Sequence, residues 1–266
     1  MKNSTYGELD VLVAGSNDEM SRAAADMFAS AVRAACEARG EIAVILATGN
    51  SQLRFVQAVR ERHDIDWSRI TVLHMDEYLG MPEGHPASFR RWMQENLIQH
   101  VKPKAFYGLV GEHEPIEEEC ERYSELLRRL DPAICVMGIG ENGHLAFNDP
   151  PADFETRELV HIVQLDEACR RQQVGEGHFT SLDDVPHGAV TLTVDALVRP
   201  HTILVLVPEL RKAEAVKSAL EGPITPACPA SILRAQSHAQ LFLDQESASL
   251  LDTARQWVDA RTLSEE

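Results

Sequence analysis

The chain alternates between short, almost purely apolar runs and longer segments in which apolar residues recur every three or four positions. An apolar run of four to seven residues is typical of a strand that is buried on both faces, as in a parallel sheet. We therefore expect strands at residues 9–14, 42–46, 70–75, 133–136, 159–165, 189–194, 202–207 and 240–243.

The segments between these runs have the period of amphipathic helices. The first helix begins at a capping box, with Ser16 as N-cap and Glu19 three residues later, and ends near Gly40. Because strands and helices alternate without a repeat or a linker, the sequence predicts one α/β domain over residues 1–266, with a mainly parallel sheet flanked by helices. The other expected helices cover residues 52–62, 87–100, 116–130, 166–173, a segment from 209 onward, and 246–261.

Composition narrows the classes of function. The 266 residues are 44% hydrophobic and 25% charged, as in ordinary globular domains. A net charge of −17 disfavours nucleic acid and anionic membranes as partners, so an anionic ligand needs a locally positive pocket. No run has membrane-spanning length, the first residues lack the pattern of a secretory signal, and the five cysteines form no C-x-x-C pair. These features favour a cytoplasmic protein with neither a disulfide framework nor a zinc site.

A glycine-rich loop with one histidine, M-G-I-G-E-N-G-H-L-A-F-N-D-P at residues 137–150, follows the fourth apolar run. Its glycines allow close approach of the backbone to a ligand. The histidine can move protons near neutral pH, and the asparagine or the aspartate can orient its ring. This combination predicts a small-molecule active site, and its key residues are Gly138, Gly140, Asn142, His144 and Asp149.

Two other interpretations of this loop compete with an acid–base site. The loop matches the dinucleotide fingerprint G-x-G-x-x-G, but that site needs a helix opening at the last glycine. The N-D-P-P sequence at residues 148–151 stops such a helix within two turns. A structural turn with a solvated histidine is the second alternative, and it is disfavoured because other strand ends also carry reactive or anion-binding groups.

Three further strand ends carry such groups. Residues 48–51 can cradle a phosphate with backbone N–H groups, or act as an ordinary helix N-cap. Asp76 and Glu77 follow the third apolar run, where one carboxylate is a candidate general base and the other a structural partner. A lysine at 212 can reach a phosphate as a point charge, although most helix lysines are simply solvated. The predicted substrate-binding set is Thr48, Gly49, Asn50, Ser51, Glu77, Gly138, Gly140 and Lys212.

Together, A-T-G-N-S at 47–51, M-D-E-Y-L-G at 75–80 and the glycine–histidine loop resemble the glucosamine-6-phosphate deaminase family. The resemblance extends over residues 9–244 and implies a modified Rossmann-like α/β fold. It also implies conversion of glucosamine 6-phosphate to fructose 6-phosphate and ammonia, with no metal or organic cofactor. In this family's chemistry Asp76 moves a proton between carbons 2 and 1, His144 opens the sugar ring, and Gly49, Ser51 and Lys212 hold the phosphate.

The chain departs from the family pattern at two positions. The family often has aspartate two residues before the histidine and glutamate five residues after it, where this chain has Asn142 and Asp149. The shorter Asp149 is expected to need a water to reach its partner, which leaves Asn142 as an alternative partner of the imidazole. The family's phosphate-binding arginine has no clear counterpart, and Arg170 and Arg171 are the nearest candidates in sequence.

Two other functions stay open at this stage. The related 6-phosphogluconolactonases share the glycine–histidine loop but usually lack the M-D-E-Y and A-F-N stretches, and lactone hydrolysis distinguishes them. A non-catalytic sugar-phosphate sensor is disfavoured because only eight residues precede the first expected strand. The sequence leaves open whether glucosamine or galactosamine 6-phosphate is preferred, and whether the protein is a monomer or a homo-oligomer.

Overall fold

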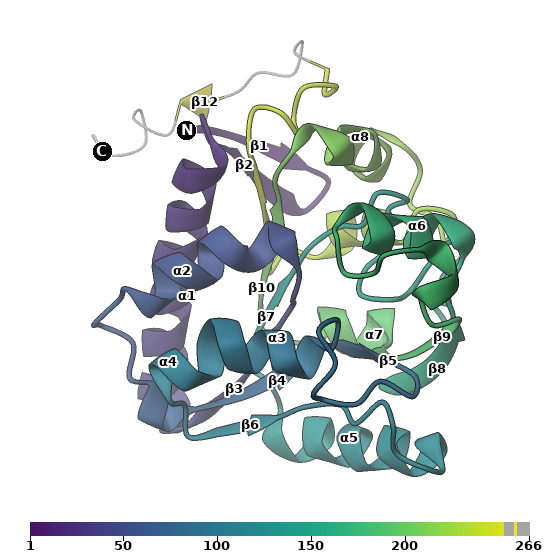
Figure 1. Ribbon diagram of the computed structural model, residues 1–266. Coiled ribbons are helices and arrows are strands. Elements are labelled where there is room, and N and C mark those ends of the chain that lie inside the picture. The colour runs from purple at the N-terminus through teal and green to yellow at the C-terminus, as the bar shows by residue number, and fades with distance from the viewer. Residues whose placement is uncertain (253–257, 260–266) are drawn as a thin grey trace.

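A long, mainly parallel sheet runs through the centre of the computed structural model, which describes residues 1–252 and 258–259 (Figure 1). Its strand order is β12-β1-β2-β11-β10-β7-β3-β4-β6. All neighbours from β2 to β6 pair in parallel, whereas β1 is antiparallel to both β2 and β12. The strands of this sheet are β1 Lys2–Tyr6, β2 Leu9–Val13, β3 Ile42–Leu46, β4 Ile70–His74, β6 Ala105–Tyr107, β7 Ile134–Met137, β10 Thr202–Val207, β11 Ala239–Leu243 and β12 Val258–Asp259.

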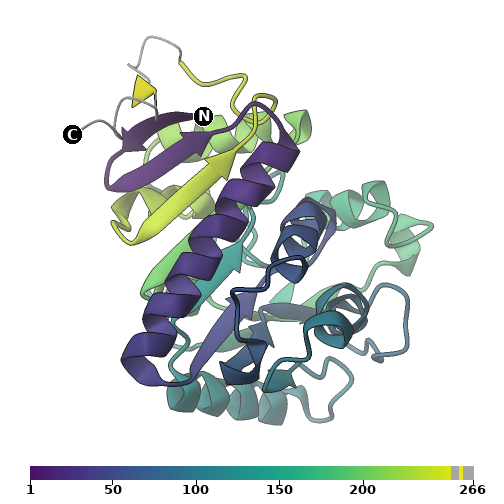
Figure 2. The same cartoon turned by 90° about the vertical axis from the view of Figure 1, so that its left-hand side faces the viewer.

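Helices cover both faces of this sheet because successive side chains of each strand point to opposite faces. In β3, Val44 belongs to the apolar cluster that includes residues of α1 and α2, whereas Ala43 and Ile45 belong to the cluster that includes residues of α5, α7 and α8. Figure 2 looks onto α1, which runs across the strands. The helices are α1 Asn17–Arg39, α2 Leu53–Arg60, α3 Phe89–Met93, α4 Gln99–Val101, α5 Ile116–Leu130, α6 Glu167–Gly175, α7 Val194–Val198 and α8 Ala213–Glu221, with a π-helical turn at Gln94–Ile98 between α3 and α4.

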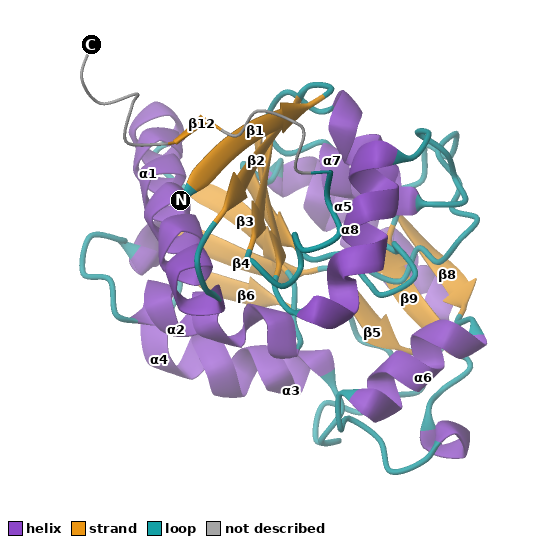
Figure 3. Ribbon diagram, turned by 90° about the horizontal axis from the view of Figure 1, so that it is seen from above, coloured by secondary structure: helices purple, strands orange, loops and turns teal. Residues whose placement is uncertain are grey.

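A second, antiparallel sheet lies beside the first (Figure 3). Its strands are β5 Asp76–Tyr78, β9 Gly188–Leu192 and β8 Val160–Gln164, in the order β5-β9-β8. Only Met75 separates β4 from β5, so the chain passes directly from the parallel sheet into the antiparallel one. An aromatic cluster supports β5, in which Tyr78 packs against Phe89, Phe147 and Phe179 with ring centroids 5.1–5.3 Å away. This junction fixes the place of Asp76 relative to both sheets.

Most expected elements are present, and the predicted cap of the first helix is confirmed. Ser16 Oγ accepts the Glu19 N–H at 3.2 Å, and Gly40, with φ of 81°, returns its N–H to the helix. The strands expected at 159–165 and 189–194 are present as β8 and β9, and they belong to the antiparallel sheet rather than to the parallel one. Val194 belongs to α7 because Thr193 caps that helix through the Ala196 N–H.

The expected helix at 246–261 is wrong where the structure describes it. Residues 246–250 form turns, and residues 258–259 form β12. Asp244 and Ser247 exchange hydrogen bonds, with Ser247 N–H donating to Asp244 Oδ1 at 2.8 Å. Such local side-chain bonds compete with a helix. Residues 253–257 and 260–261 of this prediction lie outside the described part.

Among the described residues, no helix has both the length and the apolar character required to cross a bilayer.

Candidate active site

A cavity lies where β3, β7 and β10 end and β4 passes into β5, which is the edge of an open α/β sheet where ligands bind. Its walls come from four strand-end loops and from the segment of α6 and the residues after it. Of the predicted residues, Thr48, Gly49, Ser51, Asp76, Gly138, Gly140, His144 and Lys212 line the cavity. Asn50, Glu77, Asn142 and Asp149 do not.

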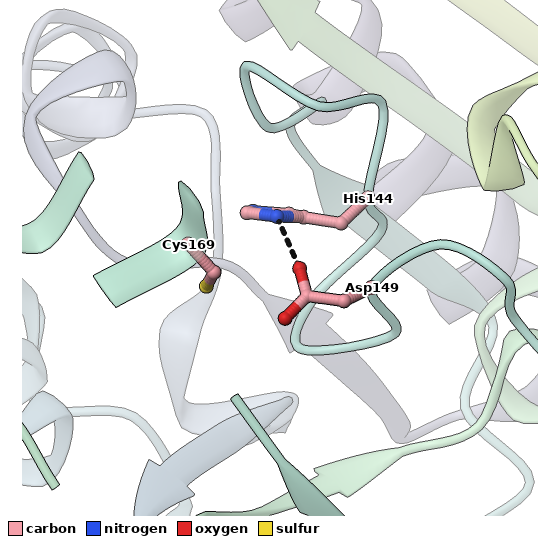
Figure 4. A group of neighbouring side chains, drawn as sticks. All are labelled: His144, Asp149 and Cys169. Carbon is pink, nitrogen blue, oxygen red and sulfur yellow. Dashed lines mark hydrogen bonds and ion pairs between the residues drawn. The ribbon is translucent and has the colours of Figure 1, made fainter. Parts of the chain in front are cut away.

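His144 and Asp149 form a buried imidazole–carboxylate pair (Figure 4). His144 Nδ1 lies 3.0 Å from Asp149 Oδ1, and both side chains are at most 10% exposed. Burial acts to raise the pKa of Asp149, but the hydrogen bonds from His144, Asn142 and the Asp166 N–H outweigh it, so this pKa is lowered. An ionised Asp149 accepts a hydrogen bond from a protonated Nδ1, and this tautomer leaves Nε2 as a proton acceptor.

The predicted alternative partner of the imidazole, Asn142, contacts the carboxylate instead. Its Nδ2 donates to Asp149 Oδ1 at 3.0 Å and to Asp166 Oδ2 at 3.2 Å, while its Oδ1 accepts the backbone N–H of His144. The expectation that Asp149 needs a water is also wrong, because the aspartate reaches the ring directly. Asn142 therefore holds two carboxylates together, one of them the N-cap of α6.

At two positions that line the cavity, the local geometry requires a glycine. A Cβ at Gly140 would lie 2.2 Å from His144 Nε2, so the ring packs directly on this backbone. Gly49 has φ of 95°, a backbone conformation that residues with a side chain rarely adopt.

The loop after β7 opens no helix, since residues 138–150 are turns and an isolated bridge, so the dinucleotide interpretation fails.

Asp76 is the cavity carboxylate with the most altered acidity. It is 7% exposed, and burial together with the charge of Glu77 raises its pKa from 3.8 to about 8. A carboxylate with a pKa near neutrality is well suited to take up and return a proton. The strand junction after Met75 presents this side chain to the same cavity as His144.

Glu77 does not contact the cavity, which contradicts its predicted place in the substrate-binding set. The side chain is fully buried, and its carboxylate accepts hydrogen bonds from Ser88 Oγ at 2.7 Å and from the N–H groups of Phe89 and Arg90 at the start of α3. A negative charge stabilises a helix N-terminus. Glu77 is thus the structural partner among the two neighbouring carboxylates.

Part of the residue set predicted to cradle an anion lies at the cavity. Thr48, Gly49 and Ser51 face the cavity from the β3–α2 loop, and Lys212 faces it from the turn before α8. Lys212 is 3% exposed, and burial lowers its pKa, with Glu176 opposing that change. Asn50 is turned away, because its Nδ2 donates to the Glu176 carbonyl at 3.1 Å.

The cavity wall that follows the Asp166 cap was not predicted, and its residues are Gln172, Gln173, Glu176 and His178. Tyr78 holds this wall in place by donating its hydroxyl to Gln173 Oε1 at 2.7 Å. Neither candidate phosphate arginine lies at the cavity. Arg170 is buried and donates to the carbonyls of Leu182 and Val185, while exposed Arg171 pairs with Glu167.

One group of side chains within the described residues has metal-ligand composition: His144, Asp149 and Cys169, whose ligand atoms lie within 4.8 Å of one another. Burial and the charges of Asp149, Asp166 and Asp76 raise the pKa of the Cys169 thiol strongly. A thiol binds metal as the thiolate. The trio is therefore better described as a neutral thiol packed beside the imidazole–carboxylate pair (Figure 4).

The fold and this edge of the sheet define a Rossmann-like α/β domain whose cavity is lined by titratable side chains and by the loop that was predicted to bind an anion. The chain belongs to the family described as glucosamine-6-phosphate isomerases/6-phosphogluconolactonase, whose sequence profile matches residues 15–243. The predicted family resemblance and fold class are thereby confirmed.

Relatives of known name agree with this assignment. A glucosamine-6-phosphate deaminase of Exiguobacterium sibiricum is 38% identical over 206 residues, 77% of this chain and 80% of the relative. One from Bacillus cytotoxicus is 33% identical and covers 92% of this chain and 90% of its own. A solved structure described as a monomeric glucosamine-6-phosphate deaminase has a TM-score of 0.82 at 31% identity, covering 90% of this chain and 99% of its own. A 6-phosphogluconolactonase from Shewanella baltica shares the fold, with a TM-score of 0.72 at 22% identity, over 91% of this chain and 97% of its own.

Proposed function

We propose that the protein is an enzyme that deaminates and isomerises a hexosamine 6-phosphate, with glucosamine 6-phosphate as the leading candidate. The observation that carries this proposal is the convergence of Asp76 and the His144–Asp149 pair on one cavity with Lys212. The names of the relatives support the same substrate. The overall reaction consumes the sugar phosphate and one water and yields the ketose phosphate and ammonia.

His144 begins the reaction in this scheme. Its Nε2 takes the proton of the hydroxyl on carbon 1, and the ring C–O bond breaks to give the open-chain aldehyde as the ring oxygen is protonated. Asp149 accepts a hydrogen bond from Nδ1–H and keeps Nε2 basic. The fixed tautomer is the contribution of the carboxylate, as in other His–Asp pairs.

Asp76 then acts on the open chain. The carboxylate removes the proton from carbon 2, giving the enolate of the open-chain amino aldehyde, and returns it to carbon 1. Transfer of one amine proton to the oxygen on carbon 1 completes the 2-imino sugar. Water adds to the C=N bond, and ammonia leaves to give the ketone. All of these steps are proton transfers and hydrolysis, so this scheme requires no cofactor. A carboxyl whose pKa lies near 8 can serve as both base and acid in successive steps.

The test is ammonia release by the purified protein from glucosamine 6-phosphate, galactosamine 6-phosphate and unphosphorylated glucosamine. We expect release from at least one phosphorylated sugar and a much weaker reaction with the sugar that lacks phosphate. Hydrolysis of 6-phosphogluconolactone is measured in parallel. Lactone hydrolysis without ammonia release would replace this proposal with the lactonase function.

We further infer that the enzyme works in the cytoplasm on a diffusible sugar phosphate. The five cysteines are all free, as expected in a reducing compartment, and the charge of −17 opposes binding to nucleic acid or anionic lipid. Cell fractionation checks the location, and sedimentation of the purified protein distinguishes a monomer from a homo-oligomer.

A further inference from the structure

A carboxylate stands in the cavity beside the anion cradle. Glu176 follows α6, and its side chain is only 9% exposed. Its Oε1 accepts hydrogen bonds from Arg211 Nη1 at 2.8 Å and Gln172 Nε2 at 2.9 Å. A Cβ placed on Gly49 would lie 3.9 Å from Glu176 Oε2, which shows how close the carboxylate is to the loop between β3 and α2.

The groups around Glu176 are those expected around a phosphate. Burial acts to raise the pKa of this carboxyl, but His178, Arg211 and Lys212 outweigh it and lower the pKa to about 2. His178 Nε2 lies 3.5 Å from Glu176 Oε2 and, among the described residues, makes no hydrogen bond although it is buried. The long contact with the Glu176 carboxylate leaves this buried nitrogen without a well-formed hydrogen bond, and a phosphate oxygen would supply one.

Arg211 is shared by more carboxylates than it can neutralise. Besides Glu176, its guanidinium contacts Glu209 Oε2 at 2.6 Å and Glu141 Oε1 at 3.0 Å. The side chains of Glu209 and Glu141 are 38% and 41% exposed, so water screens them, whereas Glu176 is enclosed. A phosphate dianion that enters beside an ionised Glu176 meets like-charge repulsion in a poorly solvated site.

We propose that Glu176 occupies the phosphate subsite of the substrate-free protein, and that Arg211 and His178 pass from its carboxylate to the substrate's phosphate when Glu176 leaves. This inference rests on the proposed function in taking the ligand as a sugar phosphate. It assigns Arg211, next to Lys212, the place of the missing phosphate arginine: Arg211 does not itself line the cavity, but it contacts the Glu176 carboxylate that does. It also makes Glu176 a built-in competitor that any anionic ligand has to displace.

The experiment is calorimetric titration of inorganic phosphate into the wild-type protein and Glu176→Gln. Glutamine keeps the size of the side chain and removes its charge. We expect Glu176→Gln to bind phosphate at least about tenfold more tightly, the scale of one charge-assisted hydrogen bond released for the ligand. The matched control is Glu141→Gln, which removes an exposed carboxylate from the same guanidinium and should change the affinity less than about twofold.

Equal or weaker phosphate binding by folded Glu176→Gln overturns the proposal, since Glu176 would then be a structural tie of the α6 segment. Equal tightening in Glu141→Gln also overturns it, because general charge removal would explain both results. Arg211→Gln provides a second test that does not depend on the folding of Glu176→Gln. It should weaken phosphate binding at least about tenfold, and unchanged or tighter binding would show that Arg211 serves only its carboxylate partners.

Ammonia release measured on the same wild-type preparation separates this inference from the proposed function. Release of ammonia with no tightening in Glu176→Gln leaves the deaminase function standing and removes the role of Glu176. If Glu176→Gln binds phosphate more tightly but no hexosamine 6-phosphate releases ammonia, the role of Glu176 stands and the deaminase function is removed.

Discussion

Asp76 and Glu77 are neighbours on β5, yet the carboxylate of Asp76 lines the cavity while that of Glu77 caps α3 from within the core. Successive side chains on a strand point to opposite faces, so one short strand supplies both a reactive group and a structural one. The pair offers matched variants that separate chemistry from stability.

Asp76→Asn keeps the shape of the side chain and removes its basicity. We expect kcat for ammonia release to fall at least ~100-fold, the lower range for loss of general acid–base catalysis, with sugar-phosphate binding retained. Glu77→Gln should instead lose roughly 1–3 kcal/mol of unfolding free energy, as expected when buried N–H donors lose a charged acceptor. Near-normal turnover by Asp76→Asn would assign the base elsewhere.

The kcat/KM profile of the wild-type enzyme should rise with pH toward about 8. Burial and the charge of Glu77 raise the pKa of Asp76 to about 8, and the free enzyme needs the deprotonated carboxylate. Because the charge of Glu77 contributes to this shift, Glu77→Gln should move the rise to lower pH. A profile that is flat between pH 6 and 9, measured with saturating coupling enzymes, contradicts the assignment.

The same group makes folding stability depend on pH in a defined direction. Asp76 has an ordinary pKa of 3.8 when unfolded and about 8 when folded, so between these values the folded state holds a proton that the unfolded state has lost. Stability should therefore fall as pH rises from about 4 to 8, by at most about 1.4 kcal/mol per pH unit from this residue. Asp76→Asn has no carboxyl at this position and lacks this pH dependence. In denaturant unfolding, the free energy of unfolding of the variant relative to the wild type should be higher at pH 8 than at pH 5. The same relative value at both pH values would exclude a raised pKa.

Lys212→Ala should raise KM for the sugar phosphate at least about tenfold while kcat changes little, because a phosphate contact acts alike in the ground and transition states. Lys217 on the exposed side of α8 provides the control, and Lys217→Ala should leave both constants unchanged. If KM stays the same in Lys212→Ala, the buried ammonium is not part of the phosphate site.

Asn142→Asp restores the residue more common in the family, yet we expect it to be harmful here. The amide nitrogen donates to both Asp149 and Asp166, and an aspartate would set a third negative charge between them. The variant should lose roughly 1–3 kcal/mol of stability at pH 7 and less at pH 5, where a carboxylic acid can donate in place of the amide. A variant as stable as the wild type at both values would show that the network rearranges without cost.

The apolar runs predicted the central strands because burial on both faces leaves a strong local signal, as at residues 42–46. β1 was not predicted, since Lys2–Tyr6 is mostly polar and becomes a strand by pairing with β2 across the turn at Gly7. The three-residue strand β5 is likewise defined by its partner β9 rather than by its own composition.

At the site, His144 and Asp76 could be predicted because each stands in a distinctive stretch next to an apolar run. Glu176 and His178 could not, since they reach the cavity only through the path of the chain after α6, which the sequence does not specify locally. Arg211 had one usable signal, its position beside Lys212 at the same strand end. The pairing of Asp149 with the imidazole required coordinates, because both Asn142 and Asp149 lay within reach in sequence.

Cys169 gives the protein an internal reporter for opening of the cavity wall. Cys169 on α6 is 1% exposed and its thiol lies beside Asp149, so an alkylating reagent can reach it only while that helix is displaced. Its alkylation rate, followed by mass spectrometry of the peptide that contains it, measures how often the wall opens. Inorganic phosphate and the charge at residue 176 should both alter that rate. The rate therefore reports how a ligand changes opening of the cavity wall, without an engineered label.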